Sequence, residues 1–206
     1  LHNSKWSVIL SNGYNSTNDR AALFILDAAD GSVSKTITVG ADNVINGLST
    51  PRAVDINGDL VTDYVYAGDL QGNLWRFDLF DASRSEPFVV NPAAPVSANT
   101  FRAAFGARPL FSATNTNRQA ITAAPTIVRH PTGLGHIVSV GTGKYIETTD
   151  AQANTSQAMT IYGIWDRQTA GQNATTTPSV TRNQLVQQNM ETAITATFED
   201  TDSSTS

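Results

Sequence analysis

The chain has 206 residues, of which 40% are hydrophobic and 15% charged, and its formal net charge is −5. A chain of this length can bury the core of one domain. Because phosphate binding needs dense positive charge, the acidic balance argues against nucleic acid or anionic lipid as the main partner. Cysteine is absent, which excludes disulfides and thiolate metal sites. No apolar run reaches the roughly 18 residues of a membrane-spanning helix.

The first strands are expected in residues 6–11 and 21–27, which are rich in β-branched and aliphatic side chains. Asp30-Gly31 is a strong hairpin signal, and residues 32–39 alternate as the returning strand. The first part of the chain therefore predicts an antiparallel meander.

The central stretch follows the same order. Residues 50–55 supply a first strand, residues 64–67 a second and residues 74–79 a third. A fourth strand is expected at residues 86–90. Four short strands of this kind predict one sheet.

A third copy follows the connector at residues 91–118. Its strands are expected at residues 122–128, 136–140 and 160–166. The last of these strands ends with Asp166, which corresponds to Asp78 in the last strand of the central stretch. The unit therefore recurs along the chain.

Repetition of a short-stranded unit is typical of β-propeller blades. We expect an all-β fold of about three four-stranded antiparallel meanders, with blades near residues 6–40, 50–90 and 121–190 and a flexible tail at 191–206. Since a closed propeller needs at least about four blades, these units form a partial ring. A β-sandwich would also use many short strands, but it does not explain the repeat.

A candidate metal site lies between the first two central strands. Residues 55–63 follow the pattern D-x-N-x-D-x-x-x-D. Alternate residues of a tight loop can aim their oxygens at one centre, and Ca²⁺ takes six to eight oxygen ligands. The expected metal ligands are Asp55, Asn57, Asp59, Val61 through its carbonyl, and Asp63.

This loop departs from the EF-hand pattern at two positions. Leu60 stands where the pattern has glycine, so a left-handed backbone there would cost on the order of 1 kcal/mol. Tyr66 stands where the closing glutamate would be, and the loop leads into a strand rather than a helix. An alternative interpretation is an ordinary Asp/Asn/Gly turn that binds nothing.

Other residue types do not suggest catalysis. The histidines His2, His130 and His136 lack metal or catalytic spacing and are expected at the surface or in loops. The tryptophans Trp6, Trp75 and Trp165 are expected to pack between blades. Gly141-Thr142-Gly143-Lys144 does not meet the full phosphate-loop pattern. No catalytic residue is therefore assigned.

Several strings resemble the C-terminal domain of the PilC/PilY family of bacterial type IV pilus proteins. The most specific is YAGDLQGNLWRFDL, from Tyr66 to Leu79. Others are Ile121 to Pro125, Gly141 to Tyr145 and Tyr162 to Asp166. The resemblance covers roughly residues 1–190.

This resemblance implies a β-propeller in an exported, extracellular protein of the pilus tip or outer cell surface. It implies a role in pilus assembly, extension and surface attachment, with minor pilins or tip proteins as partners and a host or abiotic surface as a further contact. It also implies a calcium loop, with the five ligands named above. The alternatives are a calcium-assisted propeller enzyme, such as a quinoprotein dehydrogenase or a hydrolase, and a purely structural propeller.

Overall fold

A computed structural model describes residues 1–81, 95–113, 118–151, 159–167 and 180–188. Within these residues nearly all regular structure is β. The strands are β1 (Ser7–Ser11), β2 (Ala21–Asp27), β3 (Val33–Val39), β4 (Arg52–Val54), β5 (Tyr64–Gly68), β6 (Asn73–Asp78), β7 (Arg102–Ala103), β8 (Phe111–Ser112), β9 (Thr126–Arg129), β10 (His136–Gly141), β11 (Ile161–Asp166) and β12 (Val180–Thr181). The short helical elements are η1 (Ala98–Thr100), α1 (Ala104–Ala107), η2 (Thr148–Ala151) and η3 (Arg182–Gln184).

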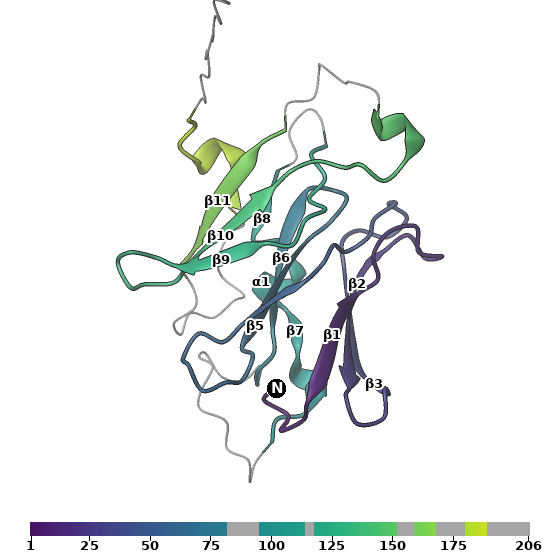
Figure 1. Cartoon of the computed structure of the whole chain (residues 1–206), viewed down its shortest axis with the longest axis vertical. Helices are drawn as coiled ribbons and strands as arrows, with labels where there is room; N and C mark the ends of the chain where they lie inside the picture. The colour runs from purple at the N-terminus through teal and green to yellow at the C-terminus, as the bar shows by residue number, and fades with distance from the viewer. Residues whose placement is uncertain (82–94, 114–117, 152–158, 168–179, 189–206) are drawn as a thin grey trace, which may run out of the picture.

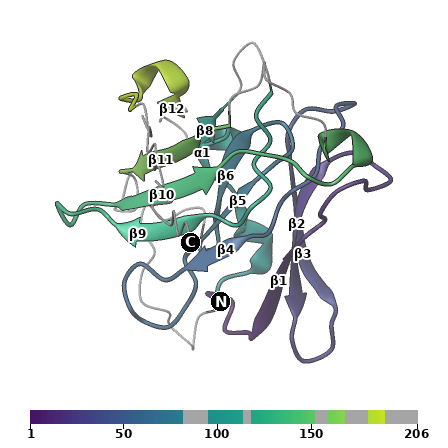
Figure 2. The same ribbon diagram turned by 45° about the horizontal axis from the view of Figure 1, so that its top comes forward.

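The strands form three sheets, which lie one after another across the molecule (Figure 1). The first sheet has the order β1-β2-β3 and the third the order β11-β10-β9. The second sheet has the order β12-β8-β6-β5-β4, with β7 also paired to β6. All pairings are antiparallel except that of β12 with β8. Each sheet contains one predicted three-stranded meander, and Figure 2 shows the same stacking from a second direction.

The strand count per sheet differs from the expected four. The described parts of the first and third sheets have three strands each, and the second has six. The fourth strand expected at residues 86–90 and the tail at 191–206 lie outside the described residues. Instead, β8 extends the second sheet beside β6, and β12 joins it from much later in the chain.

The centre of the middle sheet, at β5, is buried on both faces. Every residue of β5 is buried, and its alternate side chains enter two different cores. Tyr64 and Tyr66 belong to the core shared with the third sheet, whereas Val65 and Ala67 belong to the core shared with the first. Because strand side chains alternate between faces, one short strand joins both layers.

Close approach of the second and third sheets depends on Gly68, the last residue of β5. A Cβ atom at this position would lie 2.2 Å from the Cγ2 atom of Ile121. Ile121 precedes the third meander and forms an isolated bridge with Gly143. Any side chain at Gly68 would therefore push the two sheets apart.

The outer faces of the first and third sheets remain exposed. Val8 and Leu10 on β1 are each 45% exposed, and Ile161 on β11 is 76% exposed. Trp6, which was expected to pack between blades, is 90% exposed, so that prediction is wrong in this structure. Trp75 is buried as expected. Among the described residues no helix has the length and apolar character needed to cross a membrane.

Candidate functional site

The predicted calcium loop joins β4 to β5 at one end of the second sheet. Asp55 organises its first half, because its carboxylate accepts hydrogen bonds from main-chain amides of the same loop. Oδ1 accepts from Gly58 N at 2.7 Å and from Asn57 N at 3.1 Å, and Oδ2 accepts from Leu60 N at 2.7 Å. The loop therefore curls around this carboxylate.

The next two odd-numbered side chains repeat the arrangement. Asn57 Oδ1 accepts from Asp59 N at 2.9 Å, and Asp59 Oδ1 accepts from Val61 N at 2.9 Å. The Asn57 amide also donates to Asp59 Oδ2 at 3.3 Å. Alternate side chains thus turn back into the loop, as the sequence pattern predicts.

Leu60 has the left-handed backbone that its position in the loop implied. Its φ is 67°, and its side chain is 94% exposed. A residue with a Cβ atom in this conformation carries strain of about 1 kcal/mol or more. The exposed leucine side chain makes no compensating buried contact, so the strain falls on the loop.

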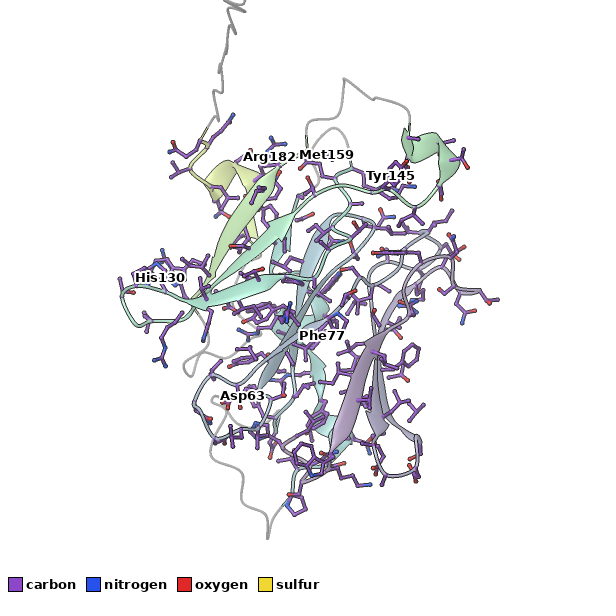
Figure 3. All side chains as sticks on the ribbon, viewed as in Figure 1. Asp63, Phe77, His130, Tyr145, Met159 and Arg182 are labelled. Carbon is purple, nitrogen blue, oxygen red and sulfur yellow. The ribbon has the colours of Figure 1, made fainter. Side chains whose placement is uncertain are left out.

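Asp63, the last predicted ligand, has a different environment from the other three side chains. It is fully buried at 0% exposure, where the loop meets β5 (Figure 3). Its Oδ1 lies 2.8 Å from His2 Nε2, and its Oδ2 accepts from Ile56 N at 2.8 Å. Its main chain pairs with Val54 and Leu79. Asp63 therefore connects the loop to the body of the protein.

The residues present suit a hard cation in type, since all five predicted ligands offer oxygen. Among the described residues, however, no group of three or more His, Cys, Asp or Glu side chains is arranged to hold a metal ion. Asn57 and the Val61 carbonyl lie outside that set of residue types. A carboxylate oxygen that accepts one hydrogen bond also keeps a further lone pair. Ligation of calcium by these residues stays a prediction.

The histidines were expected at the surface or in loops. His136 is 9% exposed and lies in β10, so this prediction is wrong for His136. His2 lies in the turn before β1, as expected, but it is buried, at 4% exposure. Burial lowers the pKa of His136 below its ordinary value of 6.5, although Asp166 opposes this shift. His130 is the first residue of the β9–β10 loop, and its ring stacks on Trp165 with centroids 3.9 Å apart.

A second group of polar residues, which the sequence did not reveal, is buried between the second and third sheets. Its centre is Arg76, 1% exposed on β6. Arg76 Nε donates to Asp78 Oδ1 at 2.9 Å, and Nη1 donates to Asp166 Oδ2 at 2.9 Å. Tyr66 OH donates to the same Asp166 oxygen at 2.9 Å. The two strand-ending aspartates of neighbouring sheets thus meet at one guanidinium.

Aromatic rings enclose this guanidinium. Its central carbon lies 4.6 Å from the ring centroid of Tyr64 and 4.5 Å from that of Phe105. Burial raises the pKa of both Tyr64 and Tyr66, so their hydroxyls stay protonated and can donate. Burial also raises the pKa of Asp78, against the opposing charges of Arg76 and Arg102. We call Arg76, Asp78, Asp166 and Tyr66 the intersheet clasp.

A further buried carboxylate, Asp69, closes the β5–β6 hairpin. It accepts from the Trp75 indole at 2.8 Å, from the Asn46 amide at 2.9 Å and from the main chain of Asn73 at 2.8 Å. Gln71 N adds a further bond at 2.9 Å. Asp69 therefore holds the turn of the most specific sequence string, which explains the tryptophan there.

The family described as the PilY1 beta-propeller domain matches residues 1–203. The chain belongs to this family. The expected fold class, an all-β partial propeller, is thereby confirmed, as is the resemblance found from the Tyr66 to Leu79 string.

Individual relatives agree with this assignment. Over 206 residues the chain is 52% identical to the type IV pilus biogenesis factor PilY1 of Pseudomonas aeruginosa strain PAO1, covering 98% of this chain and 18% of the relative. A homolog of the same factor in Xylella fastidiosa is 36% identical over 179 residues, covering 81% of this chain and 11% of the relative. Both relatives are named for pilus biogenesis rather than for a catalytic activity.

A solved structure is also similar. The crystal structure of the Pseudomonas aeruginosa PilY1 C-terminal domain matches with a TM-score of 0.81 and 53% identity, covering 89% of this chain and 39% of that chain. The chain therefore spans less than half of that domain and less than a fifth of either relative.

Proposed function

We propose that this chain is the calcium-binding propeller segment of a type IV pilus biogenesis factor that supports pilus assembly, extension and surface attachment. In this proposal the whole protein works outside the cell, at the pilus tip or outer surface, and contacts minor pilins or tip proteins and a host or abiotic surface. Family membership supports the pilus role. The observation that carries the calcium role is the repeated turning of Asp55, Asn57 and Asp59 into one loop.

The ligands in this proposal are the five residues predicted from the sequence. Asp55, Asn57, Asp59 and Val61 supply oxygens from the loop itself, and Asp63 supplies one from its junction with β5. Bound calcium would supply the positive charge that three neighbouring carboxylates otherwise lack. A ligand that binds only the folded chain stabilises it by about 2.7 kcal/mol when the free ligand concentration is a hundred times the Kd.

Calorimetric titration of the chain with calcium tests the site. The unsubstituted chain is expected to release or absorb heat on binding, and Asp59→Ala and Asp63→Ala are expected to lose most of that signal. Asp30→Ala is the matched control, because Asp30 also accepts a main-chain hydrogen bond in an exposed turn but lies in the β2–β3 hairpin. Equal heats in all four proteins would refute the calcium role.

The pilus role needs a separate test in a piliated bacterium. Cells that carry the whole protein with Asp59→Ala are expected to display fewer surface pili and to attach less well than cells with Asp30→Ala. Normal pilus number and attachment with Asp59→Ala, in a protein shown not to bind calcium, would show that pilus assembly and attachment do not depend on calcium binding.

A further inference from the structure

His2 reaches the predicted calcium loop from a distant part of the chain. It precedes β1 of the first sheet, yet its Nε2 atom lies 2.8 Å from Oδ1 of Asp63, which is 61 positions later and adjoins the second sheet. Both side chains are buried, at 4% and 0% exposure. The N-terminus lies at the same end of the molecule as this loop (Figure 2).

His2 is held both at its ring and at its main chain. Its ring meets Phe80 edge to face, with centroids 6.2 Å apart and an interplanar angle of 63°. The main-chain carbonyl of His2 accepts a hydrogen bond from Val96 N at 3.0 Å. An ionised carboxylate can only accept, so His2 Nε2 is the donor to Asp63. The donor therefore has little freedom to turn away.

Asp63 depends on this donor more than the other loop carboxylates depend on any distant residue. Asp55 and Asp59 are oriented by amides of the loop itself. Asp63 has one oxygen held by Ile56 N and the other held by His2. With both oxygens held, the carboxylate plane is set before a cation arrives, and each oxygen keeps a lone pair.

We propose that His2 is a positioning residue of the calcium site, which orients Asp63 and connects the loop to the segment that leads into the first sheet. This inference rests on the proposed calcium role. Groups that hydrogen-bond to metal ligands commonly change metal affinity about 10- to 100-fold when they are removed. Calcium binding would then also strengthen the junction between the first and second sheets.

Calcium titration of the full chain with His2→Leu and His2→Gln tests this role. Leucine keeps the bulk but removes the donor, whereas the glutamine side-chain amide can donate at a similar reach. We expect His2→Leu to raise the Kd for calcium about 10- to 100-fold. We expect His2→Gln to restore most of the affinity, which a purely steric role of the ring would not allow. His130→Leu is the control histidine variant.

The outcomes separate the two proposals. If the unsubstituted chain and Asp59→Ala both fail to bind calcium, the site itself is refuted and the role of His2 with it. If the unsubstituted chain binds and Asp59→Ala does not, equal affinity in His2→Leu overturns the positioning role alone. Affinity as weak in His2→Gln as in His2→Leu overturns it as well.

A measurement on the unsubstituted chain covers the case in which His2→Leu does not fold. The imidazole nitrogens of His2 are followed by NMR during calcium addition. The expected result is a protonated, slowly exchanging Nε2–H that persists at saturation. Loss of this signal when calcium binds would show that the hydrogen bond breaks, which would overturn the proposal.

Discussion

The guanidinium of Arg76 donates to both carboxylate oxygens of Asp166, at 2.9 and 3.2 Å, although the two residues are 90 positions apart. Arg76 lies on β6 of the second sheet and Asp166 ends β11 of the third. Both are buried, at 1% and 0% exposure. In this pair one guanidinium nitrogen, Nη1, donates to both oxygens. The charge-assisted hydrogen bond is the centre of the intersheet clasp and joins two blades.

Removal of the arginine should destabilise the fold strongly. Arg76→Met removes the guanidinium that the buried Asp78 and Asp166 share, and breaking a buried ion pair by removing one member costs about 3 to 5 kcal/mol. Urea denaturation followed by tryptophan fluorescence measures the loss. Arg102→Met is the control, because the partly exposed Arg102 lies 3.9 Å from Asp78 and should contribute less than about 1 kcal/mol. Equal losses of unfolding free energy in the two variants would contradict the stabilising role of Arg76 in the clasp.

Stability should fall on the acid side of neutrality because of His136. Burial holds the pKa of His136 below 6.5, so protonation favours the unfolded chain. The contribution of neutral His136 to the free energy of unfolding is complete above pH 6.5. It is lost as the pH falls through the lowered pKa of His136 in the folded chain. The neighbouring charges of Asp166 and Arg129 act in opposite directions on it.

The measurement is the free energy of unfolding in urea at several pH values from neutral to moderately acidic. His136→Leu should show a smaller loss over this range than the unsubstituted chain. An unchanged slope in His136→Leu would assign the acid sensitivity to other groups.

Leu60→Gly should relieve the strain of the loop. Leu60 has φ of 67°, a region that glycine enters without the roughly 1 kcal/mol cost of a Cβ atom. Leu134→Gly is the matched control, since Leu134 is also an exposed loop leucine, at 52%, but is not among the residues with positive φ. The melting temperature of Leu60→Gly should be higher than that of Leu134→Gly. The reverse order would indicate that Leu60 is not strained.

Asp69→Ala should unravel the β5–β6 hairpin. The substitution leaves the buried donors of Trp75 and Asn46 without their acceptor, and each buried group left unsatisfied costs about 1 to 3 kcal/mol. Asp69→Asn keeps one carbonyl acceptor and should lose less. Hydrogen exchange of the β5 and β6 amides, compared between the two variants, checks where the loss occurs.

The repeat could be predicted from the sequence because its information is local. The strands β2, β5, β6, β10 and β11 were expected almost at their observed bounds. The Asp-x-Asn-x-Asp spacing likewise predicted the curled loop, which forms from bonds between residues two to five positions apart. Short-range patterns of this kind are visible along one chain.

Partners that are distant in the sequence could not be predicted in the same way. Arg76 is a charged residue inside a strand and gave no sign that it is buried, because its partner Asp166 lies in another sheet. The burial of His2 could not be predicted either, because its partner Asp63 lies 61 positions later in the sequence. One available signal was the repeated strand-ending aspartate at Asp78 and Asp166, which the structure brings to one guanidinium.

The burial of the intersheet clasp also determines how the molecule responds to dissolved ions. Surface pairs such as Lys144 with Glu147, which are 3.0 Å apart but 31% and 54% exposed, weaken as mobile ions screen them. Screening acts far less on a pair as enclosed as Arg76 and Asp166. The joint between the second and third sheets should therefore keep its strength from dilute fresh water to brine.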